Sequence, residues 1–101
     1  MAEHIDDLTI AYEEDGIEVI KEIDKAILSK GAWSTIIFRY IQWEKAKDAY
    51  SKDRYSIRRY QKRLGSYQLK SKFNISSTDQ AQKVIEILSQ WLENQEEIKT
   101  P

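Results

Sequence analysis

The chain has 101 residues, of which 33% are charged and 41% hydrophobic, and its formal net charge is −1. That length supports one modest hydrophobic core in a small soluble protein. The absence of cysteine excludes disulfides, thiolate catalysis and cysteine metal sites, and it fits a reducing cytoplasm. No apolar run approaches the roughly 18 residues of a membrane-spanning helix, and the acidic N-terminus lacks the apolar region of a secretory signal. We therefore expect a cytoplasmic protein with no membrane partner.

The near-neutral net charge conceals three blocks of alternating sign. Residues 1–31 carry nine acidic and three basic side chains, a net charge of −6, and residues 73–101 carry five and two, a net charge of −3. Between them, residues 32–72 carry eleven basic and three acidic side chains, a net charge of +8. Because local charge decides what a surface attracts, this middle block favours a negatively charged partner.

The first third of the chain contains an acidic stretch and one ambiguous element. We expect residues 1–15 to form a flexible acidic arm or, at most, a loosely docked helix. Residues 17–29 place apolar side chains at helical spacing and also on one face of a strand, so periodicity leaves both alternatives open. The segment 29–31, Ser-Lys-Gly, is a turn in either case.

The middle of the chain has the composition and alternation of β-strands. The segment 33–43 is rich in β-branched and aromatic residues, which favour a strand. The charged segment 44–54 is expected to be an exposed loop. Residues 55–63 and 66–76 alternate with period two on either side of Leu64-Gly65, which is the pattern of two strands joined by a short hairpin turn.

The period of two also assigns side chains to the two faces of these last strands. The apolar side chains of the segment 66–76 share one parity and are expected to be buried together: Tyr67, Leu69, Phe73 and Ile75. The opposite parity gives both strands one continuous basic ridge, on which lie Arg58, Tyr60, Lys62, Lys70 and Lys72.

The clearest element is a helix from Ser77 to Glu93. Apolar residues recur at three- and four-residue steps and form one stripe, made of Ala81, Val84, Ile85, Leu88, Trp91 and Leu92. Ser77 and Gln80 have the spacing of a capping box at the helix start. We expect Trp91 to be buried on this stripe and residues 95–101 to form a disordered tail.

The basic segment is also where the aromatic residues gather, since nine of the eleven lie within residues 33–73. Lysine and arginine neutralise phosphates, and exposed rings stack on unpaired bases for about 1–3 kcal/mol each. This combination predicts a surface for single-stranded nucleic acid, either DNA or RNA. Backbone capture is expected from Arg39, Arg58, Lys62, Lys70 and Lys72, and base stacking from Tyr60 and Trp43.

The sequence offers little for catalysis or for a cofactor. His4 is the only histidine and lies in the expected arm, and no pair of carboxylates is marked out by burial for acid–base chemistry. The three glycines lie far apart at turns, so no phosphate-binding loop is indicated, and the ligands for zinc are too few. We therefore expect no enzymatic activity, no metal and no cofactor.

Three stretches resemble the transcriptional coactivators of the positive-cofactor-four type, including their small bacterial relatives. Residues 55–60, Tyr-Ser-Ile-Arg-Arg-Tyr, are similar to the Asp-Ile-Arg-Glu-Tyr strand of that family. Residues 70–76, Lys-Ser-Lys-Phe-Asn-Ile-Ser, resemble its lysine-rich strand and the start of its helix. Residues 30–33, Lys-Gly-Ala-Trp, are similar to the Gly-Trp start of the second strand in the bacterial members.

The resemblance covers residues 18–93 and implies both a fold and a partner. It implies an α+β fold, β-β-β-β-α, in which a curved four-stranded antiparallel sheet precedes one C-terminal helix and residues 17–29 form the first strand. It also implies a homodimer that pairs through the helices, with grooves for single-stranded DNA and a nucleoid-associated role beside the transcription machinery. The implied groove residues are Arg58 and Tyr60, the phosphate contacts Lys70 and Lys72, and the dimer contacts Leu88, Trp91 and Leu92.

The sequence thus predicts one sheet-plus-helix nucleic-acid-binding domain over residues 16–94, between an acidic arm and a tail. A second hypothesis comes from another class of protein, namely an interaction module whose basic sheet binds an acidic partner protein. The opposite charges of the first two blocks also suggest that the arm folds back on the basic surface and competes with nucleic acid.

Overall fold

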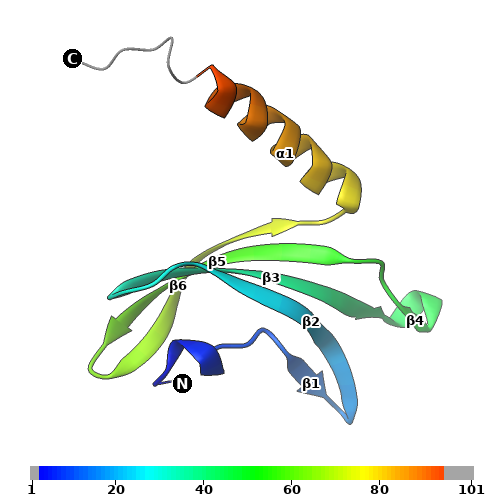
Figure 1. Ribbon diagram of the computed structural model, residues 1–101. Helices are drawn as coiled ribbons and strands as arrows, with labels where there is room; N and C mark the ends of the chain where they lie inside the picture. The colour runs from blue at the N-terminus through cyan, green and yellow to red at the C-terminus, as the bar shows by residue number, and fades with distance from the viewer. Residues whose placement is uncertain (1–2, 95–101) are drawn as a thin grey trace.

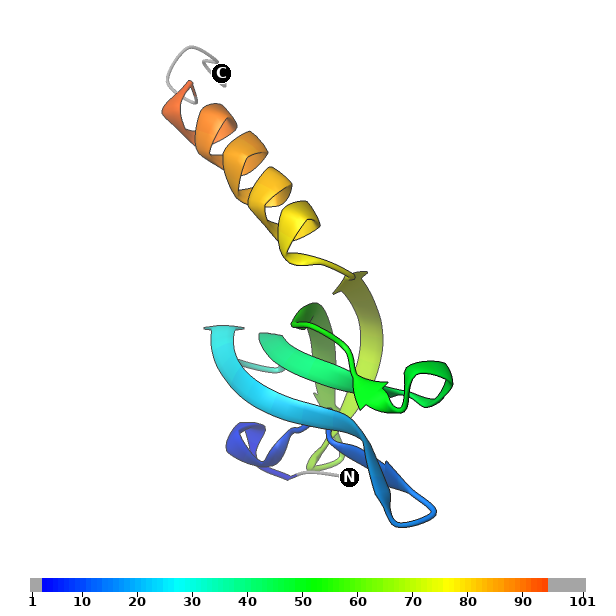
Figure 2. The same cartoon turned by 90° about the vertical axis from the view of Figure 1, so that its right-hand side faces the viewer.

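The computed structural model describes residues 3–94 as a curled antiparallel sheet, a half-barrel, followed by one C-terminal helix, α1 (Thr78–Glu93) (Figure 1). The order along the sheet is β1-β2-β3-β5-β6, with β4 paired to β3 off this path, and all pairs are antiparallel. The four long strands are those expected from the sequence: β2 (Ile17–Ser29), β3 (Trp33–Glu44), β5 (Arg54–Arg63) and β6 (Ser66–Ile75). We call the concave side of the half-barrel the inner face and the convex side the outer face (Figure 2).

Two short strands raise the number of strands from the expected four to six. β1 (Tyr12–Glu14) pairs with the beginning of β2 across a tight turn. β4 (Ala49–Tyr50) follows a 3-10 turn at Lys45–Lys47 and pairs with the end of β3. The segment 44–54, which was expected to be an exposed loop, therefore folds back along β3 as a small hairpin.

The local signals at the hairpin turn and at the helix start are confirmed. Leu64 and Gly65 connect β5 to β6 with φ values of 53° and 80°, which is the left-handed geometry of a two-residue hairpin turn. Ser77 caps α1, since its Oγ accepts a hydrogen bond from the Gln80 N–H at 3.1 Å. Gln80 reaches back in turn, and its Oε1 accepts from the Ser76 N–H at 3.0 Å.

A register shift in the β5–β6 pair changes which side chains share a face. Arg59 pairs with Ser71 and Tyr60 with Leu69, so Lys70 has no partner and forms a β-bulge. Tyr67 and Leu69 consequently lie on the inner face near Tyr60, whereas Phe73 and Ile75 lie on the outer face. The expectation that the four apolar residues of this strand share one buried face is wrong, because the bulge reverses the parity midway.

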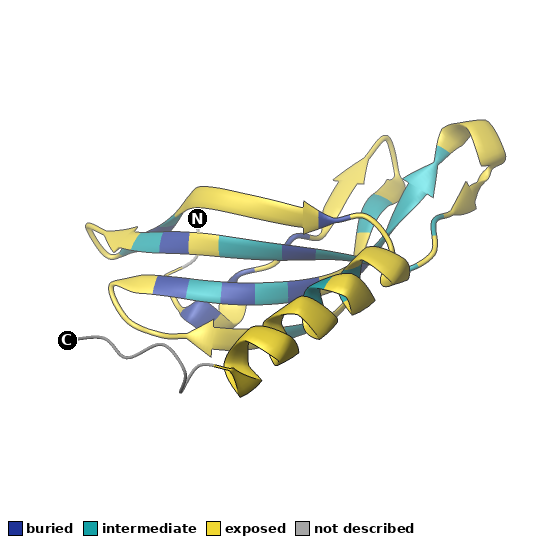
Figure 3. Ribbon diagram, turned by 90° about the horizontal axis from the view of Figure 1, so that it is seen from above, coloured by how far each residue is buried: buried dark blue, intermediate teal, exposed yellow. Residues whose placement is uncertain are grey.

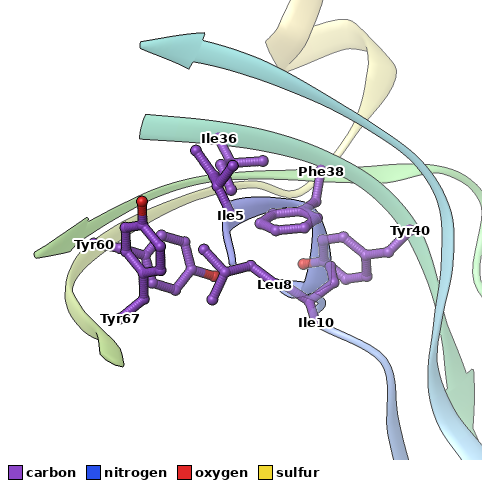
Figure 4. Close-up of a cluster of buried hydrophobic side chains, with 8 residues drawn as sticks. All are labelled: Ile5, Leu8, Ile10, Ile36, Phe38, Tyr40, Tyr60 and Tyr67. Atoms are coloured by element: carbon purple, nitrogen blue, oxygen red, sulfur yellow. The ribbon is translucent and has the colours of Figure 1, made fainter. Parts of the chain in front are cut away.

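The hydrophobic core lies on the inner face and is completed by the N-terminal segment (Figure 4). The sheet contributes buried side chains from three strands: Ile36, Phe38, Tyr40, Tyr60 and Tyr67. The N-terminal segment contributes Ile5, Leu8 and Ile10. The sequence predicts an acidic arm over residues 1–15, but the structure seats residues 5–10 on the inner face because these three aliphatic side chains are buried there.

The outer face and α1 remain largely uncovered (Figure 3). α1 stands away from the sheet, and its exposed apolar residues include Ile85, Ile87, Leu88, Trp91 and Leu92. Trp91 is 67% exposed, so its expected burial is wrong within a single chain. A cleft of about 490 Å³ between α1 and the outer face has a mainly apolar lining. Within residues 3–94, no helix has the length and apolar character needed to cross a membrane.

Candidate nucleic-acid interface

The β5–β6 hairpin carries a row of basic side chains, of which Arg58 and Lys72 stand directly opposite each other in the strand register. Like charges in this arrangement repel each other. Lys62 lies on the same face of β5 as Arg58, and Lys70 lies in the bulge of β6. Among residues 3–94, no carboxylate forms an ion pair with any of these four bases. The hairpin therefore presents uncompensated positive charge, which we call the basic row (Arg58, Lys62, Lys70 and Lys72).

Arg58 is oriented by a short polar chain across the inner face. Its Nε donates a hydrogen bond to the Ser56 Oγ at 3.2 Å, and the Ser56 hydroxyl donates to the Asn74 Oδ1 at 2.7 Å. Ser56, in the middle of this chain, is fully buried, whereas Arg58 is half-buried and Asn74 is exposed. The hydrogen bond to Ser56 therefore orients the Arg58 side chain, whose backbone position pairs with that of Lys72 across the two strands.

A hollow of about 310 Å³ opens between the hairpin and the N-terminal segment. Arg58, Tyr60, Tyr67 and Leu69 line it from the sheet, and Asp7, Leu8 and Thr9 line it from the segment. The Lys62 ammonium lies 5.3 Å from the centroid of the Tyr67 ring, in a cation–π arrangement. The hollow thus combines aromatic and aliphatic walls with cations at its rim.

Tyr60 is buried beside this hollow, with only 5% of its surface exposed. Burial raises the pKa of the Tyr60 phenol above its ordinary value of 10.0, and the nearby Arg58 guanidinium partly opposes that rise. The sequence predicts Tyr60 as a stacking platform for bases. With the N-terminal segment docked, however, Leu8 packs over the inner face and the Tyr60 ring is not accessible to a base.

The other two expected contacts lie away from the basic row. Arg39 is on the outer face and is paired with Asp53, whose Oδ2 lies 2.8 Å from both Nε and Nη2 of the arginine. Trp43 lies at the C-terminal end of β3 and packs edge-to-face against Tyr50, with 5.1 Å between the ring centroids. The structure therefore brings together Arg58, Lys62, Lys70 and Lys72 and separates them from these two residues.

Sequence reasoning missed the part that the N-terminal segment has in this site. Asp7, Leu8 and Thr9 form one wall of the hollow, although they lie about fifty residues before the hairpin. The signal available in the sequence was the spacing of Ile5, Leu8 and Ile10, three aliphatic residues within an acidic stretch. That spacing fits neither the helical nor the strand period, so periodicity does not identify these three residues as a buried set.

Comparisons with protein-family models, with curated proteins and with solved structures find no match to this chain. The resemblance to the positive-cofactor-four coactivators therefore stays a prediction from short motifs. The functional conclusion depends on the geometry of the inner face and of the basic row.

Proposed function

We propose that the protein binds single-stranded nucleic acid along the inner face of the β5–β6 hairpin. The observation that carries this proposal is the direct opposition of Arg58 and Lys72 with no carboxylate paired to either among the described residues. A phosphate between the two side chains relieves their repulsion and accepts a charge-assisted hydrogen bond from each. Lys62 and Lys70 extend the positive charge along the hairpin to further phosphates.

The preference for a single strand follows from the hollow next to the basic row. Leu69, which is exposed, offers an aliphatic surface there beside Arg58. Tyr67 lines the same hollow and adds an aromatic surface once the N-terminal segment, which buries it, has moved away. An unpaired base can enter such a hollow and pack against its walls, whereas a base within a duplex remains stacked on its neighbours. Phosphate contacts and base packing do not depend on the sugar, so the same surface suits both RNA and DNA.

The test is a fluorescence anisotropy titration of labelled oligo-dT, oligo-U and a duplex of equal length across a salt series. We expect tighter binding to the single strands, with the logarithm of affinity falling linearly with the logarithm of salt concentration. Equal binding of the duplex would remove the preference for single strands. An absence of binding at low salt would overturn the proposal.

A homodimer is part of this proposal, as the sequence resemblance implies. The apolar stripe of α1 is exposed in the single chain, since Leu88 is 49% exposed and Trp91 and Leu92 are each 67% exposed. An amphipathic helix normally buries such a stripe, so its exposure favours a second copy of the chain as its partner. A two-fold pairing through α1 and the outer face covers Leu88, Trp91 and Leu92 and leaves both inner faces available to nucleic acid.

A second candidate function is the binding of an acidic partner protein. The observation that favours it is that the inner face already accommodates a segment of the chain itself, residues 5–10, which carries two exposed aspartates. Poly-glutamate distinguishes the two candidates because it supplies negative charge without bases. Binding of poly-glutamate as tight as that of oligo-dT at equal salt favours the second candidate, and clearly tighter binding of oligo-dT favours the first.

A further inference from the structure

Residues 3–11 lie on the inner face without joining any strand of the sheet. Two side chains of β2 hold them there. The Lys25 ammonium donates hydrogen bonds to the carbonyls of Asp6 and Leu8 at 2.7 and 2.6 Å. The Glu22 Oε1 accepts from the Thr9 hydroxyl at 2.6 Å and from the Ile10 N–H at 3.3 Å. The segment is thus attached by side-chain contacts that can open without breaking the strand pairing of the sheet.

The docked segment covers the surface that the proposed function assigns to nucleic acid. Leu8 packs in one cluster with Tyr60 and Tyr67 (Figure 4). Asp7, which is exposed, lines the hollow opposite Arg58. A nucleotide strand that contacts Arg58 and packs a base against Tyr60 therefore competes with this segment for the same space.

The segment also matches the chemistry of the ligand that it excludes. It places three exposed carboxylates, those of Glu3, Asp6 and Asp7, among aliphatic residues that fill the inner face. A single-stranded nucleic acid likewise alternates negative charge with apolar rings. Both ligands satisfy a surface that is cationic along the hairpin and apolar in the middle.

We infer that residues 3–11 are an internal competitor that must leave the inner face before nucleic acid binds at full strength. This inference rests on the proposed function. The apparent affinity of such a protein is its intrinsic affinity reduced by the fraction of molecules in which the segment is undocked. Changes that weaken docking tighten nucleic-acid binding, and saturating nucleic acid exposes the segment.

The first experiment compares two full-length double variants that each remove two negative charges. Asp6→Asn/Asp7→Asn acts on the docked segment, and Glu13→Gln/Glu14→Gln is the matched control on β1, whose side chains are exposed. At low salt, we expect the first variant to bind oligo-dT roughly threefold or more tightly than the wild type, and the control to change affinity less than twofold. Equal affinities of the two variants would overturn the inference.

The second experiment follows the segment itself by amide hydrogen exchange. Lys25→Met removes the two hydrogen bonds that the Lys25 ammonium donates to the segment. It should therefore speed exchange at Ile10 and tighten oligo-dT binding, although the variant has lost a positive charge. In the wild type, oligo-dT should raise exchange at Ile10. Unchanged or slower exchange there, with oligo-dT bound, would refute displacement.

The two proposals fail in different ways. If the wild type binds no oligo-dT, the proposed function fails and the internal competition fails with it. If the wild type binds oligo-dT but Asp6→Asn/Asp7→Asn binds no more tightly than its control, only the internal competition fails.

Discussion

Arg58 and Lys72 are direct cross-strand neighbours on the inner face of the β5–β6 pair, and neither has an ion-pair partner within residues 3–94. Two other arginines of the sheet are compensated, since Arg39 pairs with Asp53 and Arg54 lies 4.0 Å from Glu44. The contrast separates bases that stabilise the fold from bases that remain available to a ligand.

Replacing either member of this pair should change how nucleic-acid binding depends on salt. Each of Arg58→Ala and Lys72→Ala removes one phosphate contact, so the slope of log affinity against log salt should become shallower by about one unit. Titration of oligo-dT at several salt concentrations measures the slope. Arg39→Ala is the control, because this arginine lies on the outer face and is held by Asp53. A slope change as large in Arg39→Ala would contradict the assignment to the inner face.

A charge placed on the apolar stripe of α1 should break the proposed homodimer. Leu88 is 49% exposed and lines the cleft between α1 and the outer face, so Leu88→Glu puts a carboxylate into the expected contact. Sedimentation velocity should show a dimer for the wild type and a monomer for this variant. Gln90→Glu adds the same charge outside the stripe and should leave the dimer intact. A monomeric wild type would contradict the prediction outright.

The buried Tyr60 should make stability fall in alkaline solution. Burial raises its pKa, so above pH 10 the unfolded chain loses this phenolic proton while the native protein retains it, and rising pH favours unfolding. The stabilisation is complete below pH 10 and is lost as pH rises through the native pKa. Urea unfolding at pH 8 to 11 should therefore show a steeper loss for the wild type than for Tyr60→Phe. Parallel losses in the two proteins would show that the phenol does not contribute.

A substitution at the hairpin turn should stabilise the protein without removing any side-chain contact. Leu64 adopts a φ of 53°, which is costly for leucine, and its side chain is fully exposed. Asparagine tolerates this conformation, so Leu64→Asn should raise the Tm by roughly 4 °C. Leu64→Ala removes the same side chain without relieving the backbone and should give no comparable gain. Thermal unfolding followed by circular dichroism distinguishes the two variants.

The elements that the sequence predicts correctly are those whose signals are local. The capping pair Ser77 and Gln80, the turn at Leu64-Gly65 and the alternation in residues 55–63 each depend on neighbours within a few positions. These local signals predict the folded structure correctly because no contact with a distant part of the chain overrides them. The last two long strands and the C-terminal helix follow from them, whereas the strand over residues 17–29 was implied only by the family resemblance, because periodicity left a helix open there.

The features that escaped prediction depend on contacts between distant parts of the chain. The bulge at Lys70 reverses the parity of β6, and a period-two pattern cannot reveal where a register shifts. The docking of Ile5 and Leu8 requires an inner face that only the folded sheet creates. The amphipathic stripe of α1 predicts that Trp91 belongs in a contact, but it does not say whether the contact lies within one chain.

β6 pairs only with β5 among the described strands, so its other side is an open edge ten residues long. Open edges invite pairing with a further strand, and lysine side chains discourage it. Lys70 and Lys72 are exposed on this strand, in the middle of its length. The lysines proposed to hold phosphates therefore also guard against edge-to-edge association. A variant that lacks both lysines is expected to aggregate through this edge. Lys70 and Lys72 should therefore be replaced one at a time, and each variant should be shown to remain soluble and unaggregated before its affinity is interpreted.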